Sequence, residues 1–297
     1  EGMKMDSMWK IPEAIIDCNW LKDRYDRQDI RIYDCTSYLH YTDEHPSQPY
    51  DVVSGFDNYR TSHIPNAVFL DLQQSLSDND SPYRFTIPAL QDLADRFKKQ
   101  GVGDPFHIIL YSANGMQWAT RIWWMLYAVG YEKVSILNGG FAAWQQAGLP
   151  TQDSITKWSP AKFEARIRPN IFVGKQRVLE AIADQKTVLL NALTRDLHLG
   201  ESARYGRPGR IPTSINIPFS NFMKNGLDYI RSASEAQQIL AEYGLTPNTD
   251  IVNYCGGGIA ATLNAFVMLQ LGFSDLQIYD NSMSEWAMDH SLAIETG

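Results

Sequence analysis

Residues 250–272 read DIVNYCGGGIAATLNAFVMLQLG. The apolar run up to Tyr254 has the composition of a short buried strand, and the glycines at 256–258 indicate a turn. From Ile259 onward the chain is apolar and begins with small residues, which predicts a helix. A buried strand, a glycine turn and a helix in direct succession are typical of α/β folds with a parallel sheet.

The glycine turn fits two different functions. Residues 256–261 match G-x-G-x-x-A, the motif that holds the phosphates of a dinucleotide. That motif normally opens the first βαβ unit of its domain, yet only 42 residues follow Cys255 in this chain of 297. A related turn at 111–116 has lost most of its glycines and could not bind phosphate in the same way. We therefore interpret the turn as one that presents the thiolate of Cys255.

The thiolate interpretation uses every residue of the turn. A cysteine at the carboxyl end of a parallel strand lies at the usual functional edge of such a sheet. Small residues after it let backbone N–H groups surround the sulfur, and the helix directs its positive end to the same point. A purely structural turn would avoid the entropic cost of three consecutive glycines. The candidate site is thus the nucleophile Cys255 with Gly256, Gly257, Gly258, Ile259 and Ala260 around the bound substrate.

The chain also repeats itself. Residues 111–144 and 254–286 both read as strand, turn, apolar helix, glycine-aromatic pair, short strand and tryptophan, and the spacing from Gly130 to Trp144 equals that from Gly272 to Trp286. Helical periodicity at 90–100 and 234–243 alternates with short apolar runs in both halves. We predict an α/β protein of two tandem domains, each a mainly parallel sheet flanked by helices. The first covers residues 1–150, the second 171–297, and 151–170 forms a linker.

Composition excludes several classes of function. The net charge of −8 and the pI near 5.2 argue against a nucleic-acid-binding protein. Three widely spaced cysteines indicate neither a disulfide framework nor a zinc site, so Cys18 and Cys35 are interpreted as structural thiols. No apolar run is long enough to span a membrane, and the first ten residues have no apolar signal core. We expect a cytoplasmic protein that binds neither nucleic acid nor membranes.

The tandem unit, the phrase His63-Ile-Pro-Asn-Ala67 and Cys255-Gly-Gly-Gly-Ile-Ala before a helix resemble the two-domain rhodanese-type sulfurtransferases, which include the thiosulfate and 3-mercaptopyruvate sulfurtransferases. The likeness extends over almost the whole chain. It implies a catalytic second domain and a catalytically silent first domain, in which Ser112 or Ala113 replaces the cysteine. It also implies a ping-pong reaction without metal or organic cofactor, in which Cys255 carries a sulfane sulfur from an anionic donor to cyanide, a thiol or a protein acceptor.

Phosphatases of this fold use a longer loop with the pattern Cys-x5-Arg. Ala261 stands six positions after Cys255, so the arginine that would hold phosphate is missing. The sequence therefore favours sulfur transfer over phosphatase chemistry.

The resemblance leaves the donor open. Thiosulfate-using members typically have basic residues after the cysteine, and 3-mercaptopyruvate-using members read Cys-Gly-Ser-Gly-Val-Thr; this chain has neither pattern. Two substrate arginines of the latter group align with Leu193 and Leu197, and the family's strand-end aspartate aligns with Asn191. Arg195 lies between the two leucines. It joins Arg204 and Arg207, on a Gly/Pro loop, as a candidate for binding the donor anion.

Two further hypotheses remain at this stage. His63 could relay a proton, with Asp51 or Asp57 orienting it, although such a histidine more often packs locally and bonds the backbone. A non-enzymatic sulfur-relay or scaffold protein with a protein acceptor is the alternative to an enzyme, because the expected substrate arginines are missing.

Overall fold

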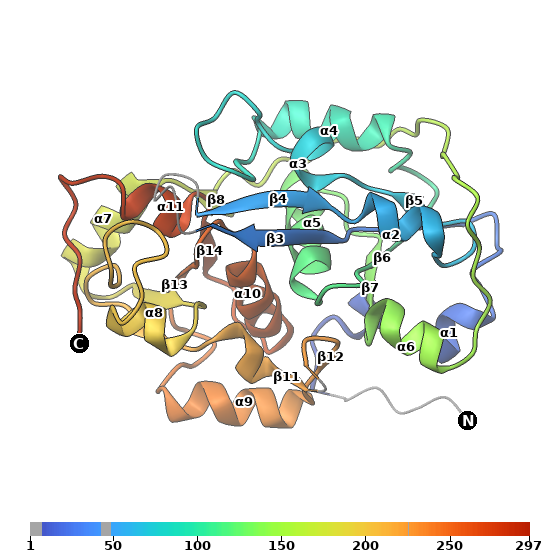
Figure 1. Ribbon diagram of the computed structural model, residues 1–297. Helices are drawn as coiled ribbons and strands as arrows, with labels where there is room; N and C mark the ends of the chain where they lie inside the picture. The colour runs from blue at the N-terminus through green and yellow to red at the C-terminus, as the bar shows by residue number, and fades with distance from the viewer. Residues whose placement is uncertain (1–7, 43–48, 225) are drawn as a thin grey trace.

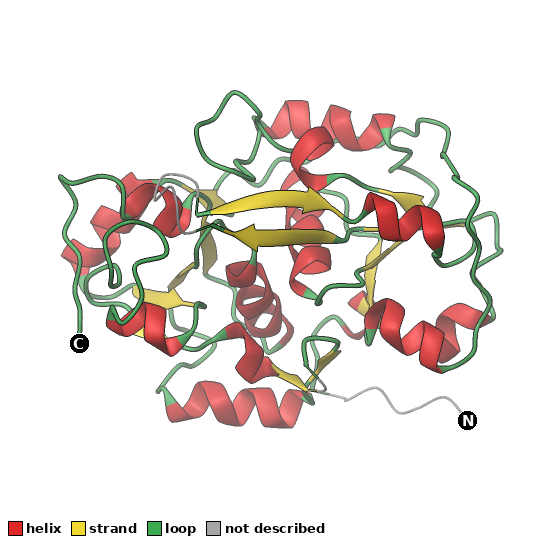
Figure 2. Ribbon diagram, viewed as in Figure 1, coloured by secondary structure: helices red, strands yellow, loops and turns green. Residues whose placement is uncertain are grey.

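The computed structural model describes residues 8–42, 49–224 and 226–297, and within them two five-stranded parallel sheets lie one after the other along the chain. Each sheet has helices on its faces (Figures 1 and 2), so the predicted α/β fold with two mainly parallel sheets is confirmed. The first ten residues, in which no apolar signal core is expected, lie partly outside these ranges.

The two sheets have the same topology. The first has the order β1-β7-β6-β2-β5 and the second β10-β9-β13-β14-β8. The three inner strands of each sheet are nearly fully buried, as expected when helices cover both faces. The bounds are β1 Ile15–Ile16, β2 Ile30–Asp34, β5 Val68–Phe69, β6 His107–Tyr111 and β7 Val134–Leu137, followed by β8 Phe172–Val173, β9 Val188–Asn191, β10 Ile215–Asn216, β13 Ile251–Tyr254 and β14 Leu276–Tyr279.

The helices begin and end close to where periodicity and turn residues predict. The helix expected at 90–100 is α4, the one at 234–243 is α9, and α10 follows the glycine turn. The helices are α1 Cys18–Lys22, α2 Phe56–Thr61, α3 Leu72–Leu76, α4 Leu90–Lys99, α5 Gln117–Val129, α6 Gly140–Gln146, α7 Lys175–Asp184, α8 Arg195–Leu199, α9 Ala233–Glu242, α10 Ala260–Gln270 and α11 Ser282–Trp286.

Helices α5 and α10 pack against each other between the two sheets (Figure 1). The hydroxyls of Thr120 and Thr262 are 2.8 Å apart, and the Trp124 indole donates to the Thr262 carbonyl at 2.9 Å. The Trp123 ring meets Phe266 edge-on, with 5.0 Å between centroids. Both helices are apolar nearly all round because each is covered by its own sheet and by its counterpart.

Each domain also extends a segment across the other. In the first domain, the main-chain N–H of Ile87 donates to the Asp280 carboxylate at 2.7 Å. In the second, the N–H of Ile230 donates to the Asn138 side chain at 3.0 Å. We call these segments, residues 85–87 and 227–230, the crossing arms. The second one includes part of the short hairpin of β11 Met223–Lys224 and β12 Tyr229–Ile230.

A longer hairpin of the first domain extends toward the second. Its strands are β3 Ser37–Tyr41 and β4 Tyr50–Ser54, which pair antiparallel apart from the main sheet (Figure 1). This hairpin brings Tyr50 to the second domain, where it lies against the glycine turn.

Residues 151–170 pass from one sheet to the next without a helix or a strand of their own; isolated bridges, such as His63 with Gln152, hold them to the first domain. Across the described ranges, none of the helices combines the length and the apolar character that crossing a bilayer would require.

Candidate active site

Cys255 lies directly after β13, in the turn that leads to α10. Its side chain is buried, with 2% of its surface exposed. The main-chain N–H of Gly258 donates to the Cys255 sulfur at 3.2 Å, and α10 begins two residues later. The sulfur thus lies beside an N–H donor and the N-terminus of a helix, both of which direct positive charge at it.

The turn is fixed by the segment that follows β14. The Cys255 N–H donates to the Ser282 hydroxyl at 3.1 Å, and the Cys255 carbonyl accepts from the N–H of Met283 at 3.0 Å. The Gly256 carbonyl accepts from both the N–H and the hydroxyl of Ser284, at 2.9 and 2.7 Å. Residues 282–284 therefore hold the cysteine in place.

The three glycines are required because other groups pack directly on the turn. A Cβ at Gly256 would lie 1.8 Å from the Tyr205 hydroxyl, and one at Gly257 would lie 2.4 Å from the Tyr50 hydroxyl. Gly258 has φ +81°, and a Cβ there would lie 2.4 Å from the Asp280 carbonyl. Close approach therefore adds a reason for glycine that the sequence did not reveal.

The first domain supplies part of this site through Arg121 on α5. Its guanidinium is fully buried and forms an ion pair with Asp280 at 2.7 Å. It also donates to the carbonyls of Gly258 at 3.1 Å and of Phe85 at 2.5 Å. A buried charge is tolerated only when paired and hydrogen-bonded, so Arg121 ties the crossing arm, the glycine turn and Asp280 together.

Tyr50 and Tyr205 close over the turn from opposite domains. Tyr50 is 2% exposed and Tyr205 is 6% exposed. Burial raises the pKa of both phenols above the ordinary value. Neither tyrosine was predicted from the sequence as a site residue. Tyr205 lies in the Gly/Pro loop with Arg204 and Arg207, which was a candidate for its arginines alone. Nothing in the pattern of β4 indicates a role for Tyr50.

The three candidate arginines have different surroundings. Arg204 is half-buried, next to Tyr205, and its guanidinium lies over the Tyr41 ring, 4.0 Å from the centroid. Arg195 is exposed in the first turn of α8. The Arg207 guanidinium is instead committed to main-chain carbonyls at 2.7–3.0 Å, those of Trp286, Ala287, Asp289 and Leu292. Arg207 thus holds the chain around and after α11, and its role in binding the donor anion stays a prediction.

Asn191, at the end of β9, lies where the family has an aspartate. Its side-chain oxygen accepts from the N–H of Leu193 at 3.0 Å, and its amide nitrogen is 3.1 Å from His198 Nδ1. Leu197 is buried in the core, as its apolar character predicts. Asn191 and its neighbours thus shape the strand end through a neutral network.

His63 packs within the first domain. It is fully buried, its Nδ1 is 2.5 Å from the Tyr59 carbonyl, and its ring stacks on the Tyr59 ring at 3.9 Å. Its backbone pairs with Gln152. Among the described residues its side chain makes no bond to Asp51 or Asp57; the contacts shown are the local ones, and the proton-relay role stays a prediction.

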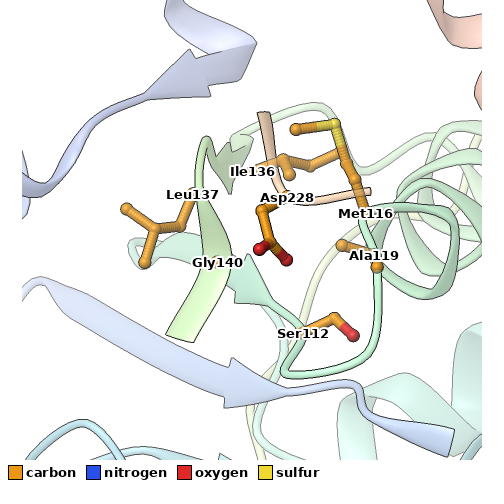
Figure 3. A pocket seen from close by; sticks show the side chains of 8 residues that line it. Ser112, Met116, Ala119, Ile136, Leu137, Gly140 and Asp228 are labelled. Carbon is orange, nitrogen blue, oxygen red and sulfur yellow. The ribbon is translucent and has the colours of Figure 1, made fainter. Parts of the chain in front are cut away.

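The equivalent of Cys255 in the first domain is Ser112. It follows β6, and its carbonyl accepts from the N–H of Phe141 at 3.1 Å, just as the Cys255 carbonyl accepts from Met283. Ser112 lines a small pocket together with Asp228, which belongs to the crossing arm of the second domain (Figure 3). The first domain therefore has a hydroxyl and a carboxylate where the second has a thiol and two phenols.

The chain is similar to several known proteins in sequence and in structure. The family model described as "Rhodanese-like domain" matches residues 17–147 and 176–289. The 3-mercaptopyruvate sulfurtransferase of Mus musculus is 32% identical over 288 residues, covering 93% of this chain and 92% of the relative. The thiosulfate sulfurtransferase of Gallus gallus is 28% identical, with 93% and 94% covered. The crystal structure of the 3-mercaptopyruvate sulfotransferase SseA from Escherichia coli superposes with a TM-score of 0.75 at 26% identity, covering 91% of this chain and 98% of that one.

Proposed function

Because this chain belongs to the rhodanese-like family and is a sulfurtransferase, like the relatives it matches, we propose that it carries the transferred sulfur as a persulfide on Cys255. The observation that carries the proposal is the buried Cys255 sulfur at the end of β13, which accepts the Gly258 N–H in front of α10. As its relatives are enzymes, the non-enzymatic scaffold hypothesis is set aside.

The first half-reaction loads the cysteine. The Cys255 thiolate attacks the outer, sulfane sulfur of an anionic donor, and a sulfur–sulfur bond forms. The bond between that sulfur and the rest of the donor breaks, and its electron pair leaves with sulfite or with the enolate of pyruvate. The scheme requires neither a metal nor an organic cofactor.

The second half-reaction unloads it. Cyanide, a thiol or a protein thiol attacks the outer sulfur, and the sulfur–sulfur bond breaks with its electron pair remaining on Cys255. The Gly258 N–H and the α10 N-terminus stabilise the thiolate that leaves in this step, because both direct positive charge at the sulfur.

Thiosulfate and 3-mercaptopyruvate are the donors that the names of the relatives suggest. Both are anions, and Arg204 is the best-placed candidate to bind them because it is half-buried and next to Tyr205, which contacts the turn. Arg195 stays a second candidate at the start of α8. Arginine suits either anion, since its planar donors match carboxylate and sulfonate oxygens.

The test is intact-protein mass spectrometry after incubation with each donor. We expect wild type to gain the mass of one sulfur and Cys255→Ser to gain none. Cys18→Ser is the matched control and must still load, because Cys18 is a half-buried thiol whose pKa burial raises to about 11. If wild type gains no sulfur with either donor, or Cys255→Ser still does, the persulfide proposal is wrong.

A further inference from the structure

Two tyrosine hydroxyls lie directly against the glycine turn that follows Cys255. The Tyr205 hydroxyl is placed so that any Cβ at Gly256 would lie within 1.8 Å of it, and the Tyr50 hydroxyl bears the same relation to Gly257 at 2.4 Å. The two phenols come from different domains, and each covers one of two consecutive glycines. Two polar groups therefore occupy the space that side chains of the turn would otherwise fill.

Both hydroxyls keep their protons at neutral pH. Each ring is buried, burial raises each phenol pKa, and the Cys255 thiol is close enough to raise it further. The other titratable groups that act on these phenols are Tyr41, Arg84 and Arg204. A neutral, buried phenol is a hydrogen-bond donor that requires an acceptor nearby.

The Tyr50 hydroxyl is held in place by the turn itself. A Cβ at Gly257 would lie 2.4 Å from it, and the nearby Ser284 hydroxyl donates to the Gly256 carbonyl at 2.7 Å. The Tyr50 ring is further supported by Phe85, with 6.3 Å between stacked centroids, and the Phe85 carbonyl accepts from Arg121. The phenol is thus fixed by groups from both domains, as a group that must meet a substrate atom would be.

The Gly258 N–H bonds the Cys255 sulfur itself, so the second sulfur of a persulfide must find its donors elsewhere. We propose that the hydroxyls of Tyr50 and Tyr205 donate to the outer sulfur of the Cys255 persulfide, which makes them catalytic residues of the sulfur transfer. This inference rests on the proposed function. Donors to the outer sulfur favour the persulfide anion and orient it, while both tyrosines keep their protons as the sulfur–sulfur bond forms and breaks.

The position of Gly256 supports a role in specificity. Since Tyr205 occupies the space beside this residue, the turn has no room for a basic side chain there. Neutral phenol donors lie against the turn instead, the charge of Arg121 is paired with Asp280, and the Arg204 guanidinium lies over the Tyr41 ring. The site is therefore suited to a donor whose charge lies away from the sulfur being transferred.

The experiment measures the pH dependence of the loaded protein. Full-length wild type, Tyr50→Phe, Tyr205→Phe and the control Tyr59→Phe are loaded with thiosulfate or 3-mercaptopyruvate, and the rate at which iodoacetamide alkylates the outer sulfur is followed by mass spectrometry from about pH 5 to 9, the range in which thiol-type groups titrate. Tyr59 is a buried tyrosine whose hydroxyl donates to the Ala67 carbonyl within the first domain. Phenylalanine keeps each ring and removes only the hydroxyl.

We expect the midpoint of the alkylation profile to move up by about one pH unit in Tyr50→Phe and in Tyr205→Phe, because each loses a donor to an anion. Tyr59→Phe should keep the wild-type midpoint. Unchanged midpoints in both active-site variants overturn the inference while the persulfide itself stands. A wild type that never loads overturns the proposed function instead. If one variant fails to fold, the other decides, since each hydroxyl contacts a different glycine.

Discussion

Ser112 and Cys255 occupy equivalent places in the two domains. Each follows the central strand of its sheet, and the carbonyl of each accepts an N–H from the first turn of a later helix, α6 or α11, at 3.1 and 3.0 Å. Three residues further on, Gly115 and Gly258 have φ +96° and +81°. The backbone around Ser112 thus matches that around Cys255, and the difference between the domains lies in the side chains.

A thiol alone should therefore not create a second sulfur-carrying site at position 112. We predict that Ser112→Cys, made in the Cys255→Ser background, gains no sulfur from either donor in the mass-spectrometric assay. Asp228 lines the same pocket, and its carboxylate disfavours a second anion there. The control is Ser112→Cys with Cys255 intact, which should gain one sulfur. A gain of sulfur mass by the doubly substituted protein would contradict the prediction.

Gly258→Ala should destabilise the protein more than the same substitution at another glycine with a positive φ. Gly258 has a positive φ, and a Cβ there meets the Asp280 carbonyl at 2.4 Å. Gly148 has φ +66° with nothing within 4 Å of its would-be Cβ. We expect Gly148→Ala to lower the free energy of unfolding by about 1–2 kcal/mol and Gly258→Ala to lower it by about 1–3 kcal/mol more, because Asp280 must move. Urea unfolding measures both, and equal losses would contradict the packing explanation.

Arg204→Ala and Arg207→Ala should have separate effects. Removing Arg204 should raise the KM for the donor roughly tenfold or more, as loss of a charged hydrogen bond does, with little change in stability. Removing Arg207 deprives several carbonyls of their donor and should lower the urea midpoint while the donor KM of the folded enzyme stays the same. Arg195→Ala, at an exposed position, should change the KM less than Arg204→Ala. The reverse pattern would return Arg207 to the substrate site.

Asp34 should make the protein less stable as the pH rises from about 4 to 6. Burial raises its pKa to about 6, so the native state retains a proton that the unfolded chain releases near pH 4. Asp34→Asn removes that penalty and should stabilise the protein by roughly 2–3 kcal/mol at about pH 7 but not at about pH 4.

The substitution is compatible with the structure, because Asn191 makes the same contact in the second domain. The Asp34 oxygen accepts from the N–H of Thr36 at 2.9 Å, as the Asn191 oxygen accepts from Leu193 at 3.0 Å. Urea unfolding at the two pH values, with the exposed Asp26→Asn as control, measures the difference. A stability gain that is the same at both pH values would exclude titration of Asp34 as its cause.

The fold follows closely from local sequence patterns. Short apolar runs, helical periodicity and the repeated order of elements are properties of neighbouring residues, so the strands around Tyr111 and Tyr254 and the helix after Ile259 lie where they were expected. The nucleophile could be proposed for the same reason: Cys255, its glycines and the helix are consecutive in the chain.

The rest of the site could not be found in this way, because it is built from contacts between distant segments. Tyr50 is far from Gly257 in the sequence, and Arg121 meets Asp280 across the domain interface. Arg207 shows the opposite limit. Its loop looks like an anion site in the sequence, and only the structure reveals that its donors are already bound to carbonyls.

The contacts between the two domains, the crossing arms among them, mean that neither half of this repeated chain is an independent module. The first domain provides Arg121 and Tyr50 to the turn after Cys255, and the second provides Asp228 to the pocket beside Ser112. Severing the chain at residues 151–170 would thus yield two incomplete fragments rather than one working and one dispensable. The half with Ser112 thus contributes structure to the site around Cys255 in the other half.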